Sequence, residues 1–128
     1  MRAYLSITHK DLVAFLISKS LAIETLYAPT PIFLQENSDC DEEELEYLLS
    51  SIAGEKSLTL RSSEKSPGIV LALEILAEQT GEESADSVTV TAPLTWDQVQ
   101  CALLAFAGDE ELTWFATQEI EIHLNEWE

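Results

Sequence analysis

The chain has 128 residues, of which 46% are hydrophobic, which is enough apolar material for one domain with a buried core. Its 24 acidic residues outnumber six Lys and Arg residues, and the formal net charge is −18. Such a surface repels phosphate backbones and anionic lipid heads, so we expect no direct binding to nucleic acid or to a membrane surface.

Side chains alternate in character over residues 2–8, and this predicts a strand with Ala, Leu and Ile on one face. Thr8 and Asp11 then form a pair like a capping box, and the apolar spacing that follows predicts a helix over 9–19. A second alternating run predicts a strand over 22–28, which ends at two prolines. The helix is just long enough to cross over, so the two strands are candidates for parallel neighbours.

The N-terminal segment also bears on cellular location. Its apolar run, Leu12–Ile17, has six residues and follows charged ones, which is not the pattern of a signal peptide. No stretch reaches the roughly eighteen apolar residues of a membrane span.

Cys40 and Cys101 form no CxxC motif, and whether they pair is left open. We expect a cytoplasmic protein, because thiols stay reduced in that compartment.

The acidic segment 38–53 predicts the longest helix. Ser38 or Asp39 is the expected cap, and four carboxylates fill the first turn, where the helix dipole favours anions. The apolar stripe of this helix consists of Leu45, Leu48, Leu49 and Ile52.

Apolar segments in the second half predict further strands. Residues 68–75 and 100–107 are apolar almost throughout and predict buried strands, with a helix as the alternative. Residues 87–92 alternate and predict a strand with one exposed face, after an acidic loop over 76–87. We expect an α+β fold: a single domain over 1–128, about six strands in a mixed or antiparallel sheet, and two helices on one face.

The C-terminal tail combines two tryptophans with many carboxylates. Residues 111–116 predict a strand, whereas 118–124 fit a strand or a helix. Trp114 falls on an apolar face and is expected to anchor the core or the sheet edge. Trp127 lies between two glutamates, and it either forms an exposed aromatic contact or docks the tail. The candidate partner-binding residues are Trp114, Glu119, Glu121 and Trp127.

Sequence motifs for catalysis are absent, since the chain has no GxSxG, GxGxxG or GK[ST] segment. Residues 39–50 match a calcium loop at three acidic positions, but Glu44 replaces the required Gly and Ser50 replaces the bidentate Glu. We therefore expect no metal and no cofactor. His9 and His123 are the only imidazoles, and a small enzyme that uses carboxylates with one of them is the alternative function.

Three glutamates adjoin apolar stretches: Glu74, Glu119 and Glu121. Burial would raise the pKa of a carboxyl group at these positions and would make it a candidate acid or base. Exposure at a strand edge is the simpler expectation for each of them.

Three segments resemble a known family: "MRAYLSIT" at the start, "DEEELEYLLSSI" in the middle and "ELTWFATQEI" near the end. They are similar to small, acidic, uncharacterised proteins from actinobacteria. The resemblance implies an actinobacterial, cytoplasmic origin and implies no activity. The matching residues are Met1, Arg2, Tyr4, Leu5, Glu44, Leu45, Glu46, Tyr47, Leu112, Trp114, Phe115, Ala116, Gln118 and Glu119.

The uneven charge leads to the functional expectation. All six cations lie in residues 1–65, whereas residues 66–128 hold thirteen acids and no cation. Acidic runs often only solvate a surface, but they also attract basic proteins and raise association rates. We expect a non-enzymatic module for protein–protein interaction with a basic partner, in an oligomeric state that the sequence leaves open.

Overall fold

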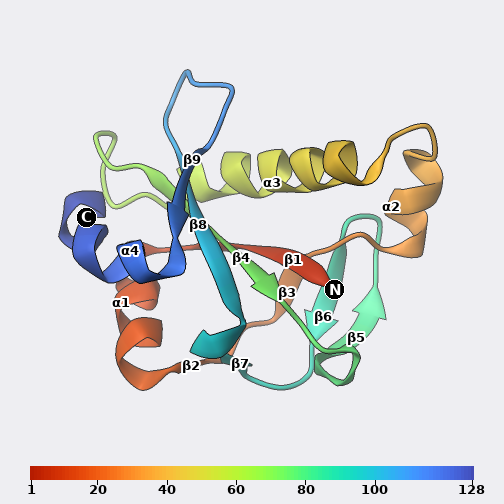
Figure 1. Ribbon diagram of the computed structural model, residues 1–128, viewed down its shortest axis with the longest axis horizontal. Helices are drawn as coiled ribbons and strands as arrows, with labels where there is room; N and C mark the ends of the chain where they lie inside the picture. Colours follow the sequence, from red (N-terminus) through yellow and green to blue (C-terminus); the bar gives the residue numbers. More distant parts are fainter.

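Nine strands form two antiparallel sheets in the computed structural model, which describes all 128 residues (Figure 1). In chain order they are β1 (Arg2–Ile7), β2 (Ser20–Leu21), β3 (Thr25–Tyr27), β4 (Gly68–Glu74), β5 (Thr80–Glu83), β6 (Ser87–Val90), β7 (Leu94–Thr95), β8 (Val99–Ala105) and β9 (Thr113–Ala116). The larger sheet has the order β5-β6-β3-β1-β4-β8-β9, and the smaller one pairs β2 with β7.

The chain also forms four α-helices and three short 3-10 helices, of which α4 and η3 follow the last strand. The α-helices are α1 (His9–Ser18), α2 (Pro31–Glu36), α3 (Glu42–Leu58) and α4 (Thr117–His123), and the 3-10 helices are η1 (Ala77–Gln79), η2 (Trp96–Gln98) and η3 (Leu124–Trp127). None of these helices combines the length and the apolar character needed to cross a lipid bilayer.

The centre of the sheet is the pair β1–β4, which is in register from Arg2 opposite Glu74 to Ile7 opposite Ile69. Every β4 residue except Glu74 is buried. A strand that is apolar along its whole length needs cover on both faces, and this sheet has it. The α+β class and the antiparallel sheet predicted from the sequence are therefore confirmed.

The two faces of the sheet carry separate cores. On one face, Leu71 packs with Phe15 of α1 and Ile120 of α4. On the other face, its neighbour Val70 packs with Leu49 of α3. Figure 1 shows α3 on one side of the sheet and α1 with α4 on the other. The expectation of two helices on one face is therefore wrong, because β4 has no polar face that water could cover.

Local caps set the helix starts. The Asp11 N–H donates to Thr8 Oγ1 at 3.1 Å at the start of α1, as the capping pair predicted. At α3, the Glu44 N–H donates to Asp41 Oδ1 at 2.9 Å, and the Asp41 N–H donates back to Glu44 Oε1. Asp41 therefore caps this helix in place of the expected Ser38 or Asp39.

Several short elements go beyond the predicted six strands and two helices. Thr30 caps α2 and Pro31 occupies its first turn, so a proline expected only to end a strand also begins a helix. β5 lies within the predicted acidic loop and pairs with β6. β3 runs antiparallel to β1, so the parallel crossover is wrong. Lys19 ends α1 in the left-handed conformation (φ 65°), and the chain passes through β2 before it enters β3.

The tail contains both a strand and a helix. β9 occupies part of the strand predicted over 111–116. The Ala116 N–H then donates to Glu119 Oε1 at 2.8 Å, and this contact begins α4. The open segment 118–124 is therefore mainly helical, and η3 carries Trp127 back into the core.

Candidate functional site

The outward side of α3 carries an exposed aromatic residue. Tyr47 is 55% exposed, whereas Leu49 and Ala53 on the inner side are buried. Two residues of helix turn the side-chain direction by about 200°, which explains the contrast between Tyr47 and Leu49. Three depressions in the surface share Tyr47 as a lining residue. Together we name them the α3 groove; its apolar lining includes Tyr47, Leu48, Leu58, Leu103, Ala105, Phe106 and Leu112.

The largest of these depressions lies between α3 and the connection from β8 to β9, and its volume is about 410 Å³. Leu112 of that connection packs over Gly54 of α3. A Cβ atom at Gly54 would lie 3.0 Å from Leu112 Cδ2, so the missing side chain lets the connection approach the helix closely. Gly54 thus shapes the groove, although in the sequence it only interrupts a helical pattern.

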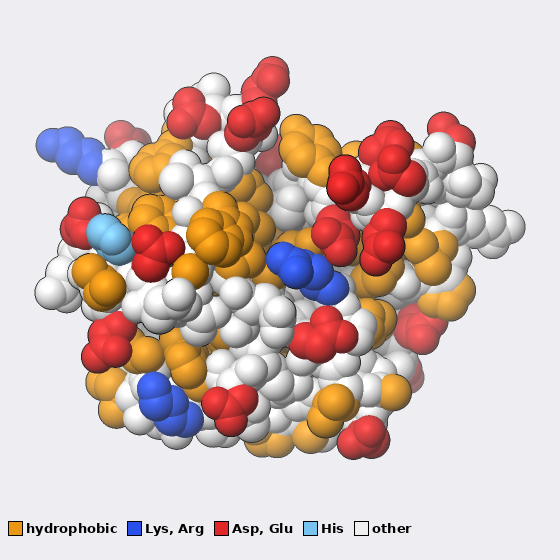
Figure 2. Space-filling model, viewed as in Figure 1, with side chains coloured by type: hydrophobic (Ala, Val, Ile, Leu, Met, Phe, Trp, Pro, Cys, Tyr) orange, Lys and Arg blue, Asp and Glu red, His pale blue; other side chains and the backbone are white.

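Carboxylates surround the α3 groove. Figure 2 shows red side chains on two sides of an orange patch, over α3 and over the connection from β8 to β9. No Lys or Arg lines any of the three depressions. The lining carboxylates are Asp41, Glu43, Glu44, Glu55, Asp109, Glu110 and Glu111.

The negative potential acts on a neighbouring thiol. Cys40 lines one end of the groove and is a free cysteine. Desolvation and the charges of Asp39, Glu44 and Asp41 raise the pKa of the Cys40 thiol. The thiol is therefore protonated at neutral pH, which makes it a poor nucleophile.

A second exposed aromatic residue lies at the sheet edge beside the groove. Trp114 of β9 is 59% exposed and stands opposite Leu103 of β8, which lines the groove. Beneath it, Arg2 Nη2 donates to Cys101 Sγ at 3.7 Å. Burial raises the pKa of the Cys101 thiol, and the Arg2 guanidinium and a hydrogen bond with Trp114 oppose part of that rise. Cys101 is buried and protonated at neutral pH, so it serves packing.

The four candidate residues from the sequence do not form one site. Trp114 is on the α3 side of the sheet, and the other three belong to the tail segment that follows β9. Trp127 is 3% exposed and packs against Phe115, with ring centroids 5.0 Å apart, so it docks the tail and forms no exposed contact. Glu119 caps α4, and Glu121 is exposed.

Sequence reasoning missed the centre of the groove. Tyr47 lies outside the leucine stripe of its helix, and a large aromatic residue on a polar helix face was a usable indication. Phe106 and Leu112 flank an acidic turn. Only the antiparallel return of β9 onto β8 brings them to α3, so no local pattern pointed to them.

The imidazoles and carboxylates that an enzyme would use are dispersed. The His9 Nε2 atom contacts the Leu124 carbonyl oxygen at 2.8 Å, and His123 Nδ1 contacts Glu126 Oε2 at 2.6 Å. None of the 24 carboxylates, Glu74 included, is among the buried residues. No three His, Cys, Asp or Glu side chains are grouped so that they could hold a metal ion.

Comparison with known proteins finds one family. A family model described as a family of unknown function (DUF6912) matches residues 1–105. The match includes α3 and ends with β8, so β9, α4 and η3 lie beyond it. No curated protein and no solved structure matches the chain.

Proposed function

The chain belongs to DUF6912, a family of unknown function, and we therefore propose its function from the site itself: it is a protein–protein interaction module whose α3 groove binds a basic, amphipathic segment of another protein. The observation that carries this proposal is an exposed aromatic centre in a groove whose lining holds seven carboxylates and no cation. The match to a family without an assigned activity neither favours nor opposes it.

The two kinds of side chain in the groove have different roles in binding. Tyr47, Phe106 and Leu112 offer apolar area, and aromatic anchors in a desolvated centre supply most of the affinity of an interface. The surrounding carboxylates raise the association rate of a cationic partner and disfavour acidic ones. A partner segment with Leu or aromatic residues on one face and Lys or Arg beside them complements both features.

The proposed compartment is the cytoplasm. Cys40 and Cys101 are both free thiols, and this suits a reducing environment.

The experiment measures binding of a fluorescent helical peptide that has Leu and Trp on one face and Lys on the other. We expect affinity to fall as salt rises from about 50 to 300 mM, because screening weakens the charge attraction. The Tyr47→Ser variant is expected to weaken binding about tenfold, as loss of an anchor does. A peptide that keeps its Lys residues but carries Ser in place of Leu and Trp is expected to bind weakly.

A matched pair of variants tests the location. Glu110→Gln with Glu111→Gln alters the groove, whereas Glu82→Gln with Glu83→Gln alters β5 at the opposite edge of the sheet by the same net charge. We expect only the first pair to slow association clearly. Bound peptide should also slow alkylation of Cys40. Equal effects of the two pairs, or equal binding of the Ser peptide, would show attraction to the acidic surface as a whole and refute the groove.

A further inference from the structure

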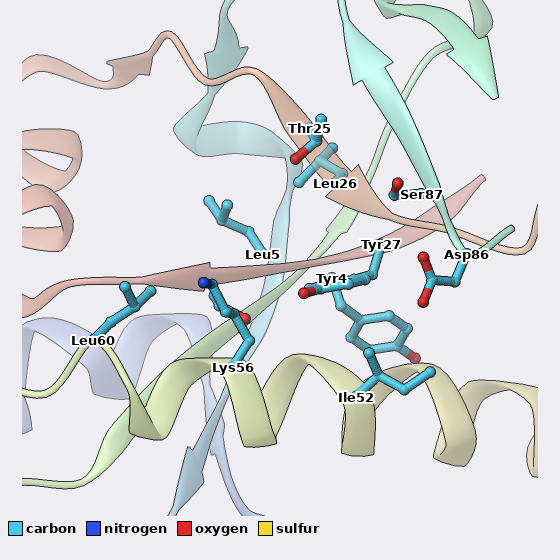
Figure 3. Close-up of a pocket in the computed structure, with 11 residues that line it drawn as sticks. Tyr4, Leu5, Thr25, Leu26, Tyr27, Ile52, Lys56, Leu60, Asp86 and Ser87 are labelled. Atoms are coloured by element: carbon cyan, nitrogen blue, oxygen red, sulfur yellow. The ribbon is translucent and has the colours of Figure 1, made fainter. Parts of the chain in front are cut away.

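A second pocket lies between α3 and strands β1 and β3 (Figure 3). Its volume is about 420 Å³, within the range of small-molecule sites. We infer that this pocket binds an elongated zwitterion, such as a dipeptide with free termini, whose carboxylate meets Lys56 and whose ammonium meets Asp86. This inference goes beyond the proposed function, since the pocket and the α3 groove share no lining residue.

The pocket arises from a split in the sheet. β1 pairs with β3 at one position only, Tyr4 opposite Tyr27, although it pairs with β4 along its whole length. Beyond that position the two strands separate, and Ser6 and Thr25 line the gap. Ile52 covers the gap from the α3 side. The gap is therefore built into the strand pairing, and Asp86 reaches the pocket from the turn between β5 and β6.

Opposite charges occupy the two ends of the pocket. Figure 3 shows Lys56 reaching from α3 towards β1 at one end and Asp86 at the other, with two tyrosines between them. The ion pairs of the chain are Met1 with Glu74 and His123 with Glu126. Lys56 thus has no carboxylate partner in a chain with 24 acids, and its ammonium group is available to an external anion.

The middle of the pocket suits an apolar linker with a polar backbone. Tyr4, Tyr27 and Ile52 provide aromatic and aliphatic walls. Ser6 Oγ already donates to the Ala53 carbonyl at 2.6 Å. Burial and the nearby Asp86 charge raise the pKa of the Tyr27 hydroxyl, so it remains a hydrogen-bond donor at neutral pH.

The negative end distinguishes a zwitterion from a simple anion. An anion held by Lys56 alone would experience repulsion from Asp86, whereas a ligand with an ammonium group at its far end is attracted to both ends. The pair of charges also sets the direction in which the ligand lies. Blocking either terminus of a dipeptide is expected to remove one of the two attractions.

The experiment titrates the protein with the dipeptide Leu-Phe and follows backbone amide shifts by NMR. We expect shifts at Tyr4, Tyr27 and Ile52, and binding about tenfold weaker for N-acetyl-Leu-Phe and for Leu-Phe amide. The Lys56→Gln variant should bind Leu-Phe and its amide equally, and Asp86→Asn should bind Leu-Phe and its N-acetyl form equally. Lys65→Gln and Asp97→Asn, at exposed positions outside the pocket lining, are the matched controls.

Three outcomes would overturn the inference. The first is the absence of binding by Leu-Phe at about 10 mM, since a site of this kind should be occupied at that concentration. The second is equal binding of the free and N-acetylated dipeptides, which indicates an anion site at Lys56 alone. The third is a set of shifts confined to the α3 groove. The cationic peptide experiment is independent of all three.

Discussion

The Trp127 side chain is 3% exposed and packs against Phe115, where the tail meets the core. Replacing Trp127 with Ala removes a large buried ring, and we expect the free energy of unfolding to fall by about 3–5 kcal/mol. Urea denaturation followed by far-ultraviolet circular dichroism measures this loss. Trp114→Ala removes an exposed ring and serves as the control, with an expected loss below about 1 kcal/mol. Equal losses would contradict the buried position of Trp127.

Ionisation of the Tyr4 hydroxyl is expected to lower the stability of the fold at alkaline pH. Burial raises the pKa of its hydroxyl above the ordinary value of 10.0, and Arg2 opposes part of that rise. The folded state therefore holds this proton more tightly than the unfolded state does. Stability is complete below the unfolded pKa and falls as pH rises through the folded pKa.

The Tyr4→Phe variant tests this coupling. We expect its urea midpoint to decline less than that of the unmodified chain between about pH 9 and 11, where tyrosine titrates. The pKa of Tyr27 is also raised, so the urea midpoint of the variant should still fall somewhat as pH rises. Identical pH profiles of variant and parent would contradict the prediction.

At the scale of elements, Gly68 sets how closely β4 approaches α3. A Cβ atom at Gly68 would lie 2.8 Å from the Ser57 carbonyl carbon and 2.9 Å from the Leu58 nitrogen, and neither backbone atom can move freely. We expect Gly68→Ala to lower the free energy of unfolding by about 1–3 kcal/mol through overpacking. Thermal denaturation measures this loss. The control is Ala107→Gly, which exchanges the same two residue types at an exposed position. An unchanged melting temperature for Gly68→Ala would show that the helix shifts without cost.

The same scale shows which elements local sequence can predict. The Thr8 cap of α1 was predicted because it is a hydrogen bond between residues three apart in the chain. The start of α3 was predicted two or three residues too early, since Ser38, Asp39 and Asp41 are all suitable caps and only Asp41 adopts that role. Long apolar runs likewise indicated β4 and β8. The two-residue strands β2 and β7 escaped prediction because they pair with each other across a long stretch of chain. The start of α2 is local, with Thr30 as its cap, but its prolines were interpreted only as the end of a strand.

At the scale of the whole molecule, 24 carboxylates share one surface and none is buried. Their mutual repulsion destabilises the compact state, and salt screens it over a Debye length of about 10 Å at 0.1 M. We expect the melting temperature to rise as NaCl is added at neutral pH. The control is the same series in acidic buffer, where a smaller net negative charge should reduce the salt effect. A flat profile at neutral pH would mean that the acids are too far apart to repel one another.

The amino-acid sequence by itself determined the α+β class, the two capped helices, the central apolar strands and the acidic surface. Each of these depends on spacing or composition within one short segment, where neighbouring residues interact whatever the rest of the chain does. Only the tertiary structure decided that helices cover both faces of the sheet, that Trp127 is buried while Trp114 is exposed, and that Phe106 and Leu112 meet Tyr47. It alone placed Lys56 and Asp86 at opposite ends of one pocket. Contacts between segments that are distant in the chain, by strand pairing or by helix packing, produce all of these juxtapositions. Side-chain alternation in a strand does not record which face its partner helix will cover.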